Sequence, residues 1–172
     1  NIGREGLGLL KLILSSNPKK IKDLTADVLC APRPIDDELY ANTSPLYGLC
    51  RDDEGRELLK SLLMENSTVL NDLIIEDLIL VRPQSAGKYH NTSPLYWLSM
   101  GGESGLGLIV YIFSKRPELI QALKIEHLTI FRPLSANTSA YTSIFYHLAH
   151  DAPAILQKFF FDNRRLAEEI SG

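Results

Sequence analysis

The sequence has only two cysteines, Cys30 and Cys50, among its 172 residues. A disulfide would need an oxidising compartment, and nothing else in the chain indicates one. Cys50 shares its place in an internal repeat, described below, with the small residues Ser99 and Ala149. We therefore expect a free thiol at a small buried position, and a chain that works in a reducing compartment, the cytoplasm.

Strong net charge and long apolar runs are also lacking. The formal net charge is −3, and charged residues make up 23% of the chain. A basic excess of the kind that indicates a nucleic-acid-binding face is therefore absent. No apolar run approaches the roughly 20 residues of a membrane-spanning helix. We expect neither a nucleic acid partner nor a membrane span, and a content of 45% hydrophobic residues is typical of a globular protein.

Motifs for catalysis and for metal binding are incomplete. Residues 102–106 read GESGL, which lacks the last glycine of the nucleophile elbow G-x-S-x-G, and no Gly-Lys-Ser/Thr phosphate loop occurs. His147 and His150 would share one face of a predicted helix, but no third metal ligand stands at a suitable spacing. We expect no enzyme activity, no cofactor and no metal site in these residues.

What the sequence does contain is a long internal repeat. Residues 42–49 read NTSPLYGL, residues 91–98 read NTSPLYWL, and a weaker third copy, TSIFYHL, fills 142–148. Two further sets of residues keep separations of 49 and 50: Arg33, Arg82 and Arg132, and Gly6, Gly55 and Gly105. A period held at so many positions predicts a repeat architecture.

Each unit of the repeat reads as a series of short helices. In the copy at 91–98, Ser93 is a helix N-cap and Pro94 suits the first helical position. A second helix is predicted over 104–115, with an inward face of Leu106, Ile109, Val110 and Phe113. Further short helices are predicted within 118–123 and 126–131. The β-branched clusters at 79–81 and 129–131 fit either helix or strand.

The repeated residues read as structural. Each tyrosine of the phrase is expected to pack between units, with its hydroxyl bonded to a neighbouring backbone group. Each arginine of the Arg-Pro pairs is expected to bond carbonyls at the end of the preceding helix, and the Asn-x-Ser/Thr windows are read as turns and caps. The structural positions are Ser44, Pro45, Tyr47, Ser93, Pro94, Tyr96, Ser143, Tyr146, Gly6, Gly55, Gly105, Arg33, Arg82 and Arg132.

These residues resemble the ankyrin repeat. The pattern Ser-Pro-Leu-Tyr-x-Leu-small, followed by Gly-x-x-Leu-Leu-x-x-Leu-Leu, is similar to that family's helix pair, which begins Thr-Pro-Leu-His-x-Ala-Ala. The match covers 44–64 and 93–115, is partial over 143–161, and includes only the second helix at 6–14. Tyrosine replaces the family's histidine, and the unit is longer than the usual ~33 residues. A three-helix armadillo-type unit, with a period of about 40–47 residues, is the alternative architecture.

The resemblance implies an all-α fold: an α-solenoid of three to four stacked ankyrin-like repeats of 49–50 residues with long connecting loops. The expected units are 1–41, which lacks its first helix, then 42–90, 91–141 and 142–172. The charged stretch 162–170 is expected to form a C-terminal cap, because end units need a polar outer face. We expect the chain to be a fragment of a longer protein, since residue 1 falls inside a unit.

The resemblance also implies a non-enzymatic scaffold that binds another protein on a concave surface and loops. Long, divergent units of this kind are similar to those of virulence effectors that intracellular bacteria inject into host cells, which implies a host protein in the host cytoplasm as partner. Trp97 is the expected hot-spot anchor. The partner-facing candidates are Trp97, Met100, His147, His150, Arg51, Asp52, Tyr40, Lys88, Tyr89, His90 and Tyr141. The alternative is a substrate-recruiting or targeting segment of a larger enzyme whose catalytic domain lies outside this chain.

Overall fold

The computed structural model describes residues 12, 16, 18–37 and 40–171. All regular secondary structure in these residues is helical, so the expected all-α class is confirmed. Gly6 and most of the helix predicted at 6–14 lie outside the described residues. The segments 79–81 and 129–131, for which the sequence fitted either helix or strand, contain no strand. Helix α6 ends at Ile79 and helix α10 at Thr129, and irregular backbone follows each of them.

The same series of elements occurs three times, in residues 26–72, 75–121 and 125–171, which we call blocks 1, 2 and 3. Each block opens with a short helix: α2 (Ala26–Cys30), α6 (Ile75–Ile79) and α10 (Ile125–Thr129). A loop follows, and in blocks 2 and 3 it contains the 3₁₀ segments η2 (Gln84–Tyr89) and η3 (Leu134–Ser139). The first helix of each pair is α3 (Pro45–Cys50), α7 (Pro94–Ser99) or α11 (Ile144–Asp151). The second helix is α4 (Asp53–Glu65), α8 (Gly102–Lys115) or α12 (Pro153–Asp162). The closing helix is α5 (Ser67–Asp72), α9 (Glu118–Gln121) or α13 (Arg164–Ser171), and η1 (Pro18–Asp23) precedes block 1.

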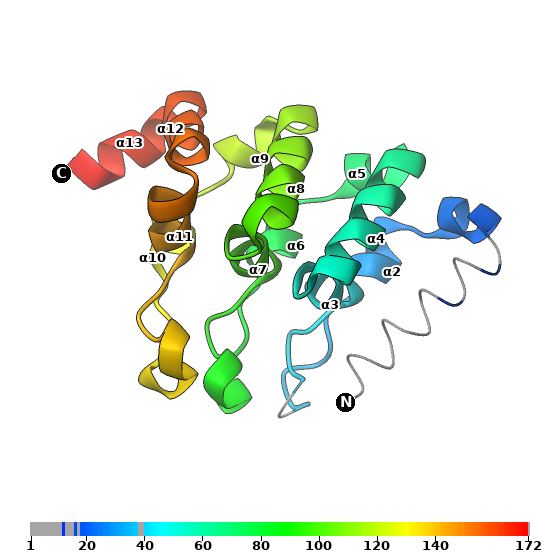
Figure 1. Ribbon diagram of the computed structural model, residues 1–172, viewed down its shortest axis with the longest axis horizontal. Helices are drawn as coiled ribbons and strands as arrows, with labels where there is room; N and C mark the ends of the chain where they lie inside the picture. The colour runs from blue at the N-terminus through cyan, green and yellow to red at the C-terminus, as the bar shows by residue number, and fades with distance from the viewer. Residues whose placement is uncertain (1–11, 13–15, 17, 38–39, 172) are drawn as a thin grey trace.

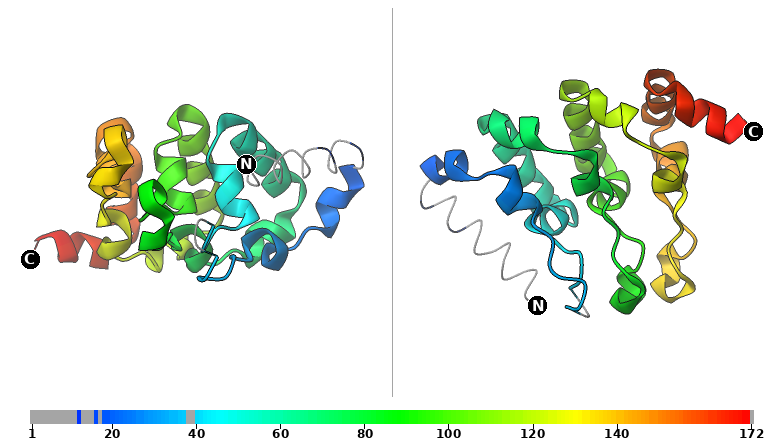
Figure 2. Two further views of the ribbon diagram at one scale, coloured as in Figure 1. Left: turned by 90° about the horizontal axis from the view of Figure 1, so that it is seen from below. Right: turned by 180° about the vertical axis from the view of Figure 1, so that it is seen from behind.

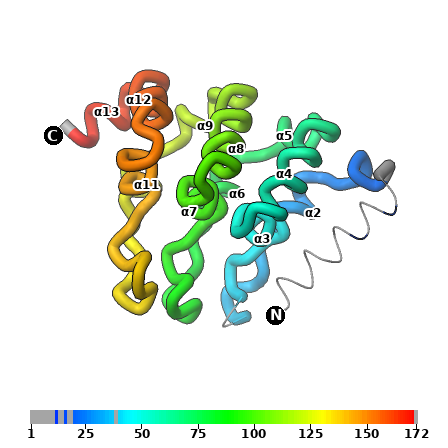
Figure 3. The backbone as a smooth tube through the Cα atoms, viewed as in Figure 1, coloured from blue at the N-terminus to red at the C-terminus, as the bar shows by residue number. Residues whose placement is uncertain are grey.

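The three helix pairs lie side by side in chain order, and the loops project together at one end (Figure 1). The same order is visible from behind (Figure 2) and along the backbone tube (Figure 3). Contacts join α3 to α7, α7 to α11, and α4 to α8. The apolar core runs through all three blocks without a break, so each block buries side chains against the next.

Serine caps start the first helices, as predicted. The Oγ atoms of Ser44, Ser93 and Ser143 accept hydrogen bonds from the backbone N–H three residues later, at 3.1, 3.2 and 3.1 Å. Pro45 and Pro94 occupy the first helical position, where a missing N–H costs nothing. The phrase Thr-Ser-Pro-Leu thus encodes a helix start.

The second helix differs in detail from the prediction. Helix α8 begins at Gly102, two residues earlier than expected. Val110 was predicted to face inward, but its side chain is 52% exposed, and Ile112 is fully buried instead. The buried residues are Gly105, Leu108, Ile109, Ile112 and Phe113, so the covered face is rotated by about one residue from the predicted one towards the contacts with α7 and α4.

Gly55 and Gly105 allow the two helices of a pair to approach closely. A Cβ atom on Gly105 would lie 2.2 Å from the carbonyl oxygen of Leu98, and one on Gly55 would lie 2.4 Å from that of Leu49. These carbonyls belong to the preceding helix, so a larger residue would force backbone apart. The structural role predicted for these two repeated positions is therefore close packing of the two helices.

Polar side chains connect the blocks at equivalent positions. The hydroxyl of Tyr47 is 2.7 Å from Oγ1 of Thr92, and that of Tyr96 is 2.7 Å from Oγ1 of Thr142. The prediction that these hydroxyls bond a backbone group was wrong, because they bond threonine side chains of the next block. Tyr146, the third expected core tyrosine, is 51% exposed, since no described block follows it.

A second set of connections runs through asparagine side chains. Asn42 and Asn91 hold left-handed backbone conformations, with φ of 57° and 62°, which asparagine adopts more readily than most residues. Their Nδ2 atoms donate to the carbonyls of Val81 and Phe131 in the next block, at 2.9 and 2.8 Å. The reading of these Asn-x-Ser/Thr windows as turns is confirmed.

The residue that follows the second helix reaches backwards, to the preceding block or, in block 1, to the residues before that block. Asn66 Nδ2 donates to the carbonyls of Ile21 and Leu24, at 2.7 and 2.9 Å. Arg116 bonds the carbonyls of Leu70 and Asn71. Asn163 bonds those of Ile120 and Leu123 at 2.7 and 3.0 Å. This role was missed in the sequence, where the equivalent positions of Asn66 and Arg116 in the repeat were the available signal.

Candidate functional site

Trp97 lies at the centre of an aromatic cluster formed by the first helices and the loops. Its ring meets the edges of Tyr47 and Tyr96 at centroid distances of 6.4 and 5.5 Å, and Tyr89 lies 6.4 Å away. Only 7% of Trp97 is exposed. The prediction of an exposed anchor was wrong, because α7 lies between α3 and α11 and the indole fills the space between tyrosines of two blocks.

His147 occupies the equivalent position in α11 and is also buried, with 9% exposed. Its Nε2 lies 3.3 Å from the hydroxyl of Tyr96, in the preceding block. His147 was predicted to face a partner and instead packs between blocks. Burial lowers its pKa below the usual value, and the carboxylate of Asp151 opposes that shift.

Three guanidinium groups lie over the rings of this cluster. Arg51 is 5.0 Å from the ring centroid of Tyr89 and 5.6 Å from that of Trp97. The other two arginines repeat this arrangement: Arg82 lies over Tyr47 and Tyr89 at 5.7 and 5.4 Å, and Arg132 lies over Tyr96 and Trp97 at 5.5 and 5.7 Å. Cation–π contacts of this kind strengthen when they are removed from water, so the cluster is a rigid base for the surface above it.

Arg33 and Arg132 of the Arg-Pro pairs were predicted to bond carbonyls at the end of the preceding helix, but their hydrogen-bond partners lie in loops. Arg132 is 5% exposed and donates through Nη2 to the carbonyl of Lys88, in the loop of the preceding block. Arg33 pairs with Asp37 at 3.0 Å. Both side chains therefore bond loop residues.

Above the cluster runs a row of exposed side chains that we call the variable row: Arg51, Met100 and His150. They hold equivalent positions at the ends of the three first helices, 49 and 50 residues apart. All three are exposed, as predicted, with Met100 at 38% and the side chain of His150 at 72%. The row presents a cation, a thioether and an imidazole at one structural position.

The remaining candidates flank this row. Asp52 is exposed and caps α4, accepting from the N–H of Gly55 at 2.8 Å. Tyr89 and His90 are half-buried, whereas Lys88 is exposed. Tyr40 is half-buried beneath the guanidinium of Arg33, at 5.3 Å. Tyr141 is 64% exposed. The loops that carry Tyr40, Lys88 to His90 and Tyr141 project at the same end of the molecule (Figure 1).

The cysteine thiols are free and unsuited to nucleophilic chemistry. Burial raises the pKa of Cys50, and burial together with the nearby carboxylate of Asp77 raises the pKa of Cys30. Both therefore stay protonated at neutral pH, whereas the thiolate is the reactive form. Ser99 is buried like Cys50, but Ala149 is exposed, so the small position is a buried one only in blocks 1 and 2.

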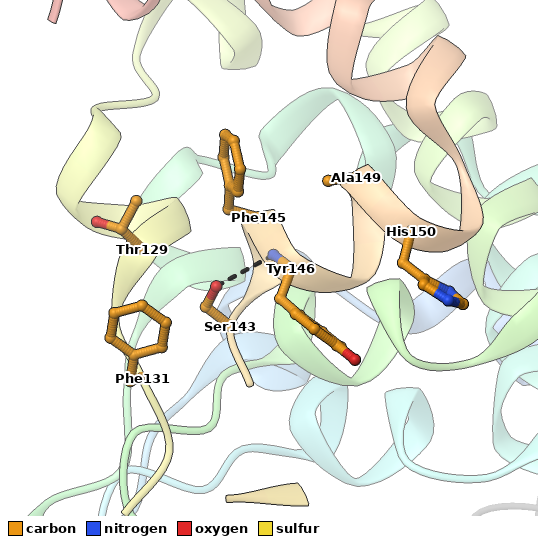
Figure 4. Close-up of a pocket in the computed structure, with 7 residues that line it drawn as sticks. All are labelled: Thr129, Phe131, Ser143, Phe145, Tyr146, Ala149 and His150. Carbon is orange, nitrogen blue, oxygen red and sulfur yellow. Dashed lines mark hydrogen bonds between the residues drawn. The ribbon is translucent and has the colours of Figure 1, made fainter. Parts of the chain in front are cut away.

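A shallow cavity of about 420 Å³ lies on the outer side of α11 (Figure 4). It is lined by Thr129, Phe131, Ser143, Phe145, Tyr146, Ala149 and His150. Most of these are apolar, and no pair of them forms an acid–base or nucleophile–base arrangement. The cavity is therefore suited to apolar contact.

Within the part of the chain that the structure describes, no three metal-ligating side chains come together, and no helix is long and apolar enough to cross a membrane. No protein-family model, curated protein or solved structure matches the chain.

Proposed function

We propose that the chain is a protein-interaction module in which ankyrin-like blocks stack into an α-solenoid. Support comes from the equivalent hydrogen bonds between successive blocks. The tyrosine–threonine bonds, the bonds from Asn42 and Asn91 to carbonyls, and the bonds from the residues that follow the second helices all recur with the sequence period. A scaffold with such repeated contacts holds its surface rigid, which lowers the entropy that a partner's binding would otherwise cost.

The variable row carries the proposal. Several buried positions of the repeat keep their residue type, as Leu46 and Leu95 do, although the buried Trp97 and His147 share a position and differ. Arg51, Met100 and His150 differ in chemistry although they occupy one structural position. Each of the three is exposed, and exposed variable positions on a fixed scaffold are typical of binding surfaces.

The partner that suits this row is a protein with an acidic and an apolar feature at neighbouring positions. Arg51 supplies a charge-assisted hydrogen bond to a carboxylate, and Met100 supplies an adaptable apolar contact. Lys88 adds a second positive charge in the adjacent loop. The similarity of the long units to those of bacterial effectors, which comes from the sequence alone, makes a protein of the host cytoplasm the first partner to look for.

The test compares the wild-type chain with the triple variant Arg51→Ala, Met100→Ala, His150→Ala in affinity capture followed by titration of the captured protein. The matched control is Glu57→Ala, Lys60→Ala, Lys115→Ala, three exposed positions on the second helices. Capture by wild type and control but loss in the row variant, with all three equally helical, supports the proposal. Equal affinity in all three would refute the assigned surface.

A further inference from the structure

The outer face of block 3 differs from the corresponding faces of blocks 1 and 2. Tyr47 and Tyr96 are 2% and 1% exposed because the next block covers them, whereas Tyr146 is 51% exposed. The small residues Cys50 and Ser99 are also buried, and their equivalent Ala149 is exposed. The same structural positions thus change from interior to surface at the last block.

The exposed face is apolar and hollowed. Phe145 and Tyr146 from α11, with Phe131 from the preceding loop, line the cavity of Figure 4. Phe160 on α12 extends the surface, since its ring centroid lies 6.3 Å from that of Phe145. Phe131 is 57% exposed. Phe145 and Phe160 are partly buried and pack against the core. An apolar surface made of exposed and half-buried side chains of this kind marks an interaction site.

Block 3 also keeps the polar group that joins one block to the next. In blocks 1 and 2 the tyrosine hydroxyl bonds a loop threonine of the following block, Thr92 or Thr142, at 2.7 Å. The hydroxyl of Tyr146 stands at the equivalent position and bonds no residue that the structure describes. A terminal block would be expected to carry a polar outer face instead.

The expected C-terminal cap does not provide such a face. Helix α13 is charged, with Arg164, Arg165, Glu168 and Glu169, and packs against α10 and α12. It corresponds to α5 of block 1, because Asn163 and Asn66 begin the two helices with the same side-chain cap, to the N–H of Leu166 and Val69. Helix α13 is therefore the regular closing helix of a block, and Tyr146 and Phe131 stay exposed in its presence.

We propose that the face formed by Phe131, Phe145, Tyr146, Ala149 and Phe160 is the docking surface for one further block of the same 49–50-residue type, carried by a segment of the protein outside these 172 residues. The occupant is a block and not an unrelated partner because Tyr146 and Ala149 repeat the positions of Tyr96 and Ser99, which are buried where block 3 follows block 2. The incoming loop would bring a hydroxyl side chain to Tyr146 and cover Ala149.

The experiment adds a block to the chain and measures the exposure of position 149. Residues 73–121 are joined after Glu169, which corresponds to Asp72 at the junction between blocks 1 and 2. The reporter is Ala149→Cys, a residue type that the interface accepts at Cys50. We expect its reaction with a thiol reagent to slow at least tenfold when the block is present, while Lys60→Cys on α4 reacts at an unchanged rate.

Two controls keep the test decisive. Tyr146→Asp should restore fast labelling at position 149, because it puts an unpaired charge into the interface. A second chimera, which adds residues 123–169, guards against poor folding of one particular block. Unchanged labelling in both chimeras would overturn the proposal. So would protection of the Ala149→Cys thiol in the original chain that increases with protein concentration, because the occupant would then be a second copy. No partner protein takes part in this experiment, so its result does not depend on whether the variable row binds one.

Discussion

The phenol oxygen of Tyr96 lies 2.7 Å from Oγ1 of Thr142, although the two residues are 46 positions apart in the chain. The pair joins block 2 to block 3, and Tyr47 with Thr92 joins block 1 to block 2 in the same way. Both threonines also donate to a carbonyl of their own loop, at 2.8 and 2.6 Å from Ser139 and Tyr89. Each tyrosine thereby ties the loop of the next block to its own first helix.

Removing this hydroxyl should weaken the contact between blocks. We expect Tyr96→Phe to lower the free energy of unfolding by about 1 kcal/mol, the net contribution of a typical buried hydrogen bond. Urea unfolding measures it. Tyr146→Phe is the matched control, since the Tyr146 hydroxyl bonds none of the described residues and its loss should leave stability unchanged. Equal losses in both variants would show that the hydroxyl–threonine contact contributes nothing specific.

Two glycines of helix α8 should respond to alanine in opposite directions. Gly105→Ala would place Cβ 2.2 Å from the Leu98 carbonyl oxygen, and the resulting displacement should cost about 1–3 kcal/mol. Gly107→Ala meets no atom within 4 Å and should stabilise the chain by up to about 1 kcal/mol, because alanine favours the helix. Thermal and urea unfolding of both variants check this, and the prediction fails if Gly105→Ala is the more stable.

Trp97 should behave as a core residue. We expect Trp97→Ala to lower the free energy of unfolding by about 3–5 kcal/mol, as for other large buried aromatics, whereas Met100→Ala should change it by less than about 0.5 kcal/mol. Trp97 is the only tryptophan in the sequence, so native fluorescence should be blue-shifted and should move to the red on unfolding. A water-exposed emission spectrum in the native state would contradict its burial.

Acid should destabilise the chain through His147. Its pKa is lowered in the folded state, first by burial, from an ordinary value of 6.5. Below pH 6.5 the unfolded chain therefore binds a proton that the native chain resists. Stability should be constant above this pH and should fall as the pH drops towards the folded pKa.

The pH effect of His147 is separable from that of other histidines. Burial also lowers the pKa of His127, so wild type carries two contributions of the same sign. Between pH 7.5 and pH 5.5, the free energy of unfolding of His147→Gln, measured with urea, should fall by less than that of the wild type. An identical loss in wild type and variant would show that His147 does not titrate as its surroundings imply.

The sequence by itself determined the local structure and the period. Ser93 followed by Pro94 sets a helix start through short-range hydrogen bonding and a fixed φ angle. The recurring Gly55 and Gly105 indicated close packing before any contact was known. These features involve residues near one another in the chain, or a repetition that the sequence displays directly.

Only the tertiary structure decided which repeated positions are interior. Trp97 varies between units, as a binding residue would, but Tyr47 from one block and Arg132 from another enclose it. Tyr146 keeps the residue type of Tyr47 and Tyr96, yet its side chain is half exposed. In both cases burial depends on a neighbouring block about 50 residues away, and a side chain's own position in its helix carries no information on whether that neighbour is present.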